Sequence, residues 1–158
     1  MIESIKKIIS QIYKDTGIRI IQANQTANPP PLPYGVYNIT SPYIKDRSRG
    51  SLSTYQEGEK VYQKHTEAFK MTISFNFYSE TNETTIETAM QVRRWFLFLD
   101  LDFIRDQNIA VVNVGNIENR TTFLIDSYEY KHGFDVQLRL ADEQIKAIET
   151  IEKVNLGG

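Results

Sequence analysis

Three aspartates that lie close together, Asp100, Asp102 and Asp106, have the spacing that most nearly fits a metal site. EF-hand loops bind Ca²⁺ through oxygen ligands at alternating positions, and they also need a glycine and a distal glutamate. Ile104 interrupts that order. We therefore expect these carboxylates to lie in a solvated loop at a helix end, and we expect no metal ion.

The two histidines, His65 and His132, are the next candidates for acid–base chemistry. Neither has a nearby Ser or Asp motif that would make it a recognisable base, so we expect both at the surface. The chain has no cysteine, which excludes disulfides, thiol nucleophiles and Cys-based zinc sites. Sequence motifs for nucleotide, metal and acyl chemistry are also missing. We expect no enzymatic activity, no catalytic residue and no cofactor.

Cationic side chains suit protein contacts better than catalysis here. Arg120, which follows Asn119, has a planar guanidinium that could bind a partner's carboxylate or anchor its own turn. Lys45, Arg47 and Arg49 could hold the acidic surface of a neighbouring copy, or they could lie in a mobile solvated loop. Both alternatives remain open for each group.

Charge is divided unevenly along the chain. Residues 1–79 carry ten Lys and Arg against six Asp and Glu, whereas residues 80–158 carry eight against fourteen. The cations are spread over several expected elements and are partly neutralised by neighbouring acids, which is unlike a nucleic-acid-binding stripe. We expect no sequence-specific DNA binding, and the two halves offer patches of opposite charge for self-association.

The expected elements begin with an amphipathic helix over residues 2–15, whose isoleucines recur at helical spacing and which ends at Gly17. Short strands are expected over residues 17–24 and 33–40, with extended prolines between them. Residues 45–66 contain almost no aliphatic side chains, although they keep Tyr55, so we predict a projecting hairpin or arm. Residues 69–78 alternate strictly between apolar and polar, which predicts a half-buried strand.

A long helix is expected to begin at about Thr81 and to continue to about Leu99. Its core face is predicted to hold the following side chains: Ile86, Ala89, Met90, Arg93, Phe96 and Leu97. Near its end the helix is apolar almost all round, because the opposite face, which is polar at first, continues into Phe98 beside Trp95 and Leu99. A neighbouring subunit could cover this extra apolar surface, or the apolar side chains could form a buried cluster within the chain.

The second half continues with a central strand over residues 109–115 and two strands over 121–140 that turn near His132-Gly133. A final helix is expected to start at Asp142 and to contain Ile145, Ile148 and Ile151. The chain is therefore predicted to form one α+β domain over residues 1–158, with a mixed or antiparallel sheet flanked by helices. Residues 45–66 form the protruding arm or loop, and residues 141–158 form a C-terminal helix or tail.

The N-terminal residues have no uninterrupted apolar run of the kind found in signal peptides or membrane spans, so we expect cytoplasmic synthesis and no membrane contact.

Several short motifs, in this order and spacing, resemble those of phage neck or tail-terminator proteins. They are Pro30-Pro31-Leu32-Pro33-Tyr34, Thr72-Ile73-Ser74-Phe75, Trp95-Phe96, Ile109–Val114, Asn119-Arg120 and Gly133-Phe134-Asp135-Val136. The resemblance covers roughly residues 1–140. It implies an α+β subunit without an active site, which assembles as a hexameric ring on the finished tail tube and presents the surface that joins the head.

The resemblance also implies the partners. They are further copies of the chain, the tail-tube protein, the sheath protein of a contractile tail, and a head-completion or connector protein, and DNA can pass through the ring. The protein is expected in the tail or neck of the virion, after assembly in the host bacterial cytoplasm. The candidate contact residues are Lys45, Arg47, Arg49, Tyr55, Trp95, Phe98, Asn119 and Arg120.

Two other functions remain open from the sequence. One is a head-completion, connector or tail-tube subunit, which shares the modest size and the lack of catalytic motifs. The other is a cytoplasmic ligand-binding module or small enzyme, in which the arm acts as a lid over a pocket.

Overall fold

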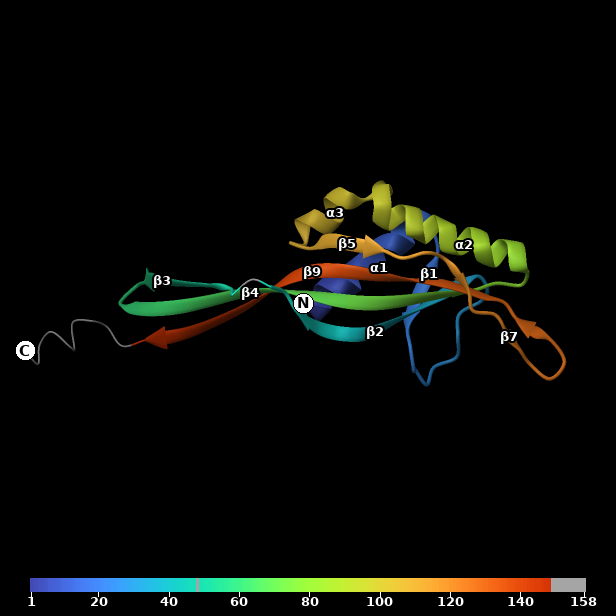
Figure 1. Ribbon diagram of the computed structural model, residues 1–158, viewed down its shortest axis with the longest axis horizontal. Helices are drawn as coiled ribbons and strands as arrows, with labels where there is room; N and C mark the ends of the chain where they lie inside the picture. The colour runs from blue at the N-terminus through green and yellow to red at the C-terminus, as the bar shows by residue number, and fades with distance from the viewer. Residues whose placement is uncertain (48, 149–158) are drawn as a thin grey trace, which may run out of the picture.

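Two long antiparallel strands, β4 (Lys60–Tyr78) and β9 (Lys131–Ile148), run along the length of the protein (Figure 1). The computed structural model describes residues 1–47 and 49–148. The two strands pair without a break from Val61 opposite Ile148 to Tyr78 opposite Lys131. The alternation over residues 69–78 is confirmed, because its apolar side chains lie on one buried face of β4.

The other strands extend this pair into a seven-stranded mixed sheet with the order β1-β2-β4-β9-β5. β3 also pairs with β4, and β6 pairs with β9. Only β1 and β2 pair in parallel; the remaining pairs are antiparallel. The strands of this sheet not yet bounded are β1 (Arg19–Gln22), β2 (Tyr34–Lys45), β3 (Ser51–Glu57), β5 (Ala110–Val114) and β6 (Glu118–Asn119). A separate small sheet joins β7 (Thr122–Phe123) to β8 (Tyr128–Glu129).

One face of the sheet is covered by helices, so the α+β single-domain prediction is confirmed. The helices are α1 (Ile2–Thr16), α2 (Asn82–Arg94), the π-helix η1 (Trp95–Leu99) and α3 (Leu101–Asp106). The predicted N-terminal helix is confirmed as α1, which buries Ile5, Ile8 and Ile12 and ends at Gly17. Gly17 has φ 77°, a left-handed conformation that glycine adopts without a Cβ clash.

The start of α2 agrees with the prediction, but the buried face agrees only in part, at Ala89 and Phe96. Thr81 caps the helix through its side chain, which accepts a hydrogen bond from the Thr84 N–H at 3.2 Å. Thr85, Thr88, Ala89 and Val92 are buried, whereas Met90 and Leu97, both expected in the core, are exposed. Thr85 and Thr88 can be buried because each hydroxyl donates to a backbone oxygen one turn earlier, at 2.6 and 2.7 Å.

Three predictions for the second half are wrong. The strand over residues 109–115 was predicted to be central, but β5 lies at one end of the described sheet order beside β9, and its Val112 is 37% exposed. The chain does not turn near His132-Gly133, because β9 continues through both residues; the turn lies between β7 and β8, where the Leu124 N–H donates to the Ser127 oxygen. No helix starts at Asp142, because residues 142–148 pair with β4 as the end of β9. Ile151 and the rest of the predicted helix lie outside the described residues.

Beyond the helices, the sheet continues as a narrow projection (Figure 1). It consists of β3, the first half of β4 and residues 141–148 of β9. A projecting hairpin was predicted from the sequence, but the third strand was not. We call these three strands the arm, and the helix-covered remainder the body.

Candidate assembly surfaces

The cations Lys45, Arg47 and Arg49 lie where the arm leaves the body, and all three are exposed. Asp46, between them, is partly buried and accepts hydrogen bonds from the backbone N–H of Arg47 at 2.8 Å and from Arg139 Nε at 2.9 Å. These hydrogen bonds, first that from the Arg47 N–H, hold the pKa of Asp46 below its ordinary value. Within residues 1–47 and 49–148, neither Arg47 nor Arg49 forms an ion pair.

Tyr55, the candidate on the arm itself, lies on β3 and stacks on Tyr62 of β4, with ring centroids 5.4 Å apart. It is 37% exposed, so one side of its ring remains available to another molecule. The stacked pair lies directly across the strand pair, where aromatic side chains stabilise a sheet.

Trp95 and Phe98, which the sequence suggested as one apolar surface, are separated by the structure. Trp95 is completely buried, packs edge-on against Phe96, and donates a hydrogen bond from Nε1 to Asp15 at 2.8 Å. A neighbouring subunit therefore cannot reach its side chain in this structure. Phe98 is 80% exposed. Trp95 therefore belongs to a buried cluster within its own chain. Phe98 forms an exposed apolar surface, which a neighbouring subunit could cover.

The exposed apolar surface at this end of α2 follows from the π-helix. The wider turn places Trp95 and Phe96 in the core and leaves the next side chains outside. We call these exposed side chains the Phe98 patch; they are Leu97, Phe98, Leu99 and Leu101. The sequence indicated Phe98 but assigned Leu97 to the core, because a regular helical period continues where the structure has a π-helix.

Arg120 contacts its own chain on the open face of the sheet. One guanidinium nitrogen donates to Ser74 Oγ at 3.0 Å and to Asn76 Oδ1 at 2.9 Å, and the other donates to Glu118 at 2.7 Å and to Asp135 at 3.3 Å. Its side chain is 23% exposed. The structure thus favours the alternative in which Arg120 anchors its own strands.

Glycine at position 133 makes room for this arginine. A Cβ there would lie 2.2 Å from the Phe75 oxygen and 2.8 Å from an Arg120 nitrogen. Asn119, the neighbouring candidate, is exposed, and its Oδ1 accepts from the Thr121 N–H at 3.1 Å. Asn119 therefore shapes the chain after β6.

Sequence reasoning missed a second exposed apolar surface, the tip of the β7–β8 hairpin. Ile125 is 94% exposed, and Phe123, Leu124 and Tyr128 are also exposed. The sequence signal was Asp126-Ser127, a turn-forming pair inside an apolar run that we had assigned to a continuous strand. We call Phe123, Leu124 and Ile125 the hairpin tip.

A groove of about 500 Å³ lies beside the hairpin tip and is lined by prolines and tyrosines, including Pro30, Leu32, Tyr34, Tyr78 and Tyr128. Tyr34 and Tyr78 stack with centroids 5.1 Å apart. Burial, and next the negative charge of Glu129, raise the pKa of each of these two tyrosines. Both hydroxyls therefore stay protonated at neutral pH and can donate hydrogen bonds.

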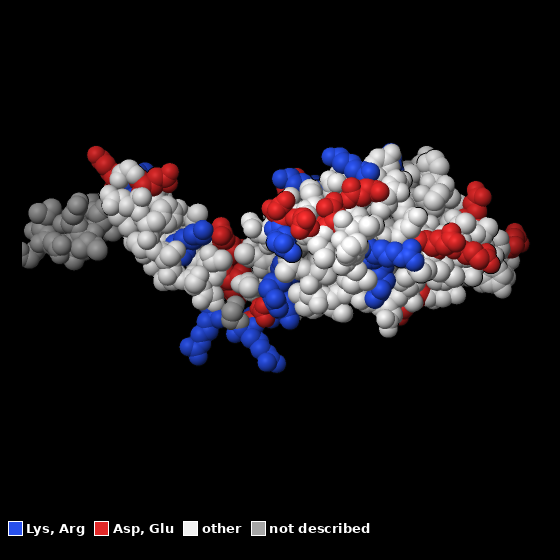
Figure 2. Space-filling view, turned by 90° about the horizontal axis from the view of Figure 1, so that it is seen from above, with Lys and Arg blue, Asp and Glu red and all other residues white. Residues whose placement is uncertain are grey.

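Charged side chains gather differently at the two ends of the body. Figure 2 shows Lys and Arg side chains where the arm leaves the body, and Asp and Glu side chains at the opposite end. The exposed acids near the hairpin tip and the start of α2 are Glu80, Glu83, Asp126 and Glu129. Acidic side chains also lie near the base of the arm in this view, so the two ends of the body differ in charge only in part.

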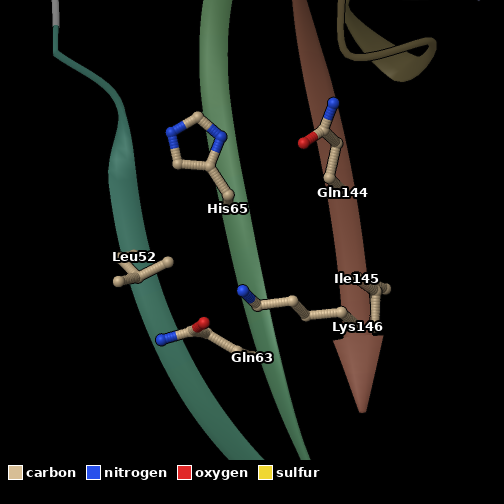
Figure 3. A pocket seen from close by; sticks show the side chains of 6 residues that line it. All are labelled: Leu52, Gln63, His65, Gln144, Ile145 and Lys146. Atoms are coloured by element: carbon tan, nitrogen blue, oxygen red, sulfur yellow. The ribbon is translucent and has the colours of Figure 1, made fainter. Parts of the chain in front are cut away.

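The histidines lie in two different environments. His132 is 5% exposed, so its predicted surface position is wrong; it lies on the core face of β9, opposite Phe77. Burial lowers its pKa, and its Nδ1 has no hydrogen-bond partner among the described residues. His65 is partly exposed on the arm, beside a shallow groove of about 430 Å³ that Leu52, Gln63 and Gln144 also line (Figure 3).

Asp102 pairs with Arg105 at 3.7 Å, and the described residues contain no cluster of histidine and carboxylate side chains that could hold a metal ion. No helix in the described part of the chain is both long and apolar enough to span a membrane. The surfaces offer apolar patches, partly separated charges and open strands, which are features of protein contacts.

Comparison with known proteins agrees with this description. The sequence matches no curated protein. The family model for phage neck terminator proteins matches residues 3–158. That family has a structural role in the tail and neck of the virion, which confirms the resemblance, the structural function and the virion location expected from the sequence. Because the match covers nearly all of the 158 residues, the chain belongs to the phage neck terminator protein family.

Proposed function

We propose that the protein assembles as a hexameric ring that caps the tail tube, ends tube polymerisation and forms the surface to which the head is joined. Its partners in this role are its own copies, the tail-tube protein, the sheath protein of a contractile tail, and a head-completion or connector protein. The proposal builds on membership of the neck terminator family, which implies contact with other tail and head proteins.

The observation that carries the proposal is that exposed apolar side chains gather in two separate places. The Phe98 patch follows the C-terminal end of α2, whereas the hairpin tip lies near the N-terminal end of that helix (Figure 1). Thirteen helical residues separate the two ends, which corresponds to roughly 20 Å. A subunit with two such surfaces can contact two different partners, as a protein between tube and head must do.

The partial difference in charge between the two ends of the body supports a ring. In a head-to-tail ring, two different patches of the same chain meet at every interface, and closure stops further growth. Exposed cations at the base of the arm and exposed acids elsewhere supply unlike patches (Figure 2). Lys45, Arg47, Arg49, Tyr55 and Phe98 are our proposed contact residues.

The test combines mass measurement with microscopy of tail tubes. Light scattering gives the number of copies in the purified protein, alone and with tubes, and electron microscopy shows whether the tube ends carry a six-fold cap. We expect Phe98→Ser and Ile125→Ser to fold normally by circular dichroism and to weaken tube capping or head joining. Glu87→Ser, at an exposed position on α2, is the matched control.

The outcome that contradicts the proposal is a protein that leaves tube ends bare. A ring that binds heads but not tubes would instead indicate a head-completion subunit, and incorporation along the tube would indicate a tube subunit.

A further inference from the structure

The arm has no hydrophobic core of its own. Every residue of β3 is exposed, and in the arm Leu52 and Ile145 are 64% and 55% exposed. Figure 3 shows one face of these strands, where the side chains of His65, Gln63 and Gln144 stand beside Leu52 along a shallow groove. A small sheet exposed on both faces is only marginally stable by itself.

The arm also has two open strand edges. β3 pairs only with β4 among the described residues, so its other edge carries backbone N–H and C=O groups without strand partners. On the opposite side, β5 pairs with β9 only as far as Arg139, so residues 141–148 are open on that edge within the described chain. Such edges readily accept a strand from another molecule.

The charges at these two edges are complementary. The register places Ser51, Thr66 and Glu143 in one row across β3, β4 and β9. Exposed Arg47 and Arg49 precede the β3 end of that row, whereas Glu143 forms its β9 end, next to Asp142 of the neighbouring row. Lys64 already contacts Glu143 at 3.3 Å, but Glu143 remains exposed and Asp142 makes no ion pair with another described residue.

We propose that the open edge of β3 in one copy pairs with residues 141–148 of β9 in the next copy. The arms would then form one continuous sheet around the ring, so this inference rests on the proposed ring. β3 and β9 both run antiparallel to β4 and therefore point the same way. Rotation about an axis along the strands keeps that direction, so the new pair is parallel.

If Ser51 of one copy lies opposite Glu143 of the next copy, Arg47 and Arg49 come close to the carboxylates of Asp142 and Glu143. This pairing also uses both open edges of every arm, whereas a two-fold pair of β3 strands would leave the β9 edges open. The head-to-tail arrangement is therefore the one that satisfies all of the edge backbone groups. Apolar side chains such as Ile145 would gain neighbours across the new strand pair.

Disulfide trapping tests the pairing directly, since the natural chain has no cysteine. Ser53 and Ile145 share a row with Lys64, so the head-to-tail pair brings them together on one face. The double variant Ser53→Cys with Ile145→Cys should give a ladder of covalent oligomers on mild oxidation, ending at the size of the ring. Replacing Glu143 or Ala147 by cysteine instead of Ile145 tests registers shifted by two residues.

The controls separate this pairing from other contacts. Each single cysteine variant should remain monomeric under denaturing conditions, and Ser53→Cys combined with Glu87→Cys should give no ladder. Reversing the charge at Arg47 and Arg49 to glutamate should prevent assembly, and adding Asp142→Lys with Glu143→Lys should restore it.

Several outcomes would overturn the pairing. Disulfide dimers of Ser53→Cys alone would indicate a two-fold pair of β3 strands, and double variants with no more cross-linking than the single variants would reject edge pairing. A ring seen by light scattering without any ladder would reject the arm pairing but leave the capping function standing. A cross-linked ring that does not bind tube ends would reject the capping function but leave the arm pairing standing.

Discussion

The carboxylate of Asp15, at the end of α1, accepts a 2.8 Å hydrogen bond from the indole Nε1 of Trp95, at the start of η1. The contact joins residues 80 positions apart in sequence and fixes the first helix against the π-helix. Asp15 is exposed while Trp95 is completely buried. The buried indole ring is therefore hydrogen-bonded to a carboxylate that lies at the edge of the core and is accessible to water.

We expect Asp15→Ala to lower the free energy of unfolding by about 1 kcal/mol more than Asp15→Asn does, because asparagine keeps an oxygen that accepts the indole proton. Both variants remove the same charge, so their difference reports the hydrogen bonds that Asp15 accepts from Trp95 and Gln11. Urea unfolding followed by tryptophan fluorescence measures it, since Trp95 is the only tryptophan. Equal stability of the two variants would show that these hydrogen bonds do not stabilise the fold.

Asp100→Asn should make the protein more stable at neutral pH. A hydrogen bond shared with Asp15 is the main cause that raises the pKa of Asp100, and the same contact lowers the pKa of Asp15. The protonated form of Asp100 therefore stabilises the fold at low pH, and this contribution is lost as the pH rises through its raised pKa. The gain stays below about 1 kcal/mol, because both carboxylates are near solvent.

The stability difference between Asp100→Asn and the natural protein should shrink as the pH falls and Asp100 becomes protonated. Thermal unfolding at a series of pH values measures it. Asp106→Asn is the matched control, because Asp106 is exposed and forms no ion pair with another described residue. A gain that persists unchanged in acid would contradict this account.

His132 should make the protein sensitive to mild acid. Burial lowers its pKa below the ordinary value of 6.5, so the neutral form is favoured in the folded protein. A base with a depressed pKa stabilises the fold above its unfolded pKa, and that stability is lost as the pH falls towards the folded value. His132→Phe should therefore flatten the decline in unfolding free energy between about pH 7 and pH 5.

The same substitution removes a buried nitrogen that has no partner among the described residues, so its cost at neutral pH should be small. Chemical denaturation at several pH values gives both quantities, and His65→Gln, on the arm, is the control. An unchanged slope in His132→Phe would show that another group causes the acid sensitivity.

Gly133→Ala should destabilise the protein strongly, by about 2–3 kcal/mol, because the added Cβ would meet the Phe75 backbone and the Arg120 side chain. Gly58→Ala is the matched control: it lies in open space but has φ 64°, so it costs only about 1 kcal/mol of backbone strain. Chemical denaturation compares the two. A smaller loss at Gly133 than at Gly58 would show that the sheet relaxes around the methyl group.

Arg120→Ala in the Gly133→Ala background separates the arginine from the other two contacts of that methyl group, which are the Phe75 oxygen and Asn76 Oδ1. If the arginine is the main obstacle, removing it should recover part of the lost stability. If the Phe75 oxygen is the main obstacle, the double variant should lose at least as much unfolding free energy as the two single variants added together.

The body of the fold could be predicted from the sequence where apolar residues recur at the regular spacing of a strand or a helix. The alternation from Phe69 to Phe77 and the isoleucines of α1 are such cases, and both elements are confirmed. The buried face of α2 was found only in part, because Thr85 and Thr88 look polar but satisfy their hydroxyls within the helix. A buried threonine of this kind has no distinct signal in a single sequence.

The end of β9 was mistaken for a helix because Ile145 and Ile148 are three residues apart, a spacing typical of a helix. Strand pairing with β4 decides the outcome there, and that contact is between residues far apart in the chain. The candidate surfaces were found in part for a similar reason. Phe98 was noted from its apolar neighbourhood, but only the π-helix shows that Trp95 points inwards while Phe98 points outwards.

The unbroken pairing of β4 with β9 also has a mechanical meaning. Eighteen consecutive residue pairs span roughly 60 Å and pass from the arm into the body without a loop or a hinge. A displacement of the arm therefore meets no loop in these two strands before it reaches the body. A tilt of the arm is therefore passed along β4 and β9 to the packed rings of Phe75, Phe77 and Phe134 beneath the helices. The position of the arm is in this way coupled to the core of its own subunit.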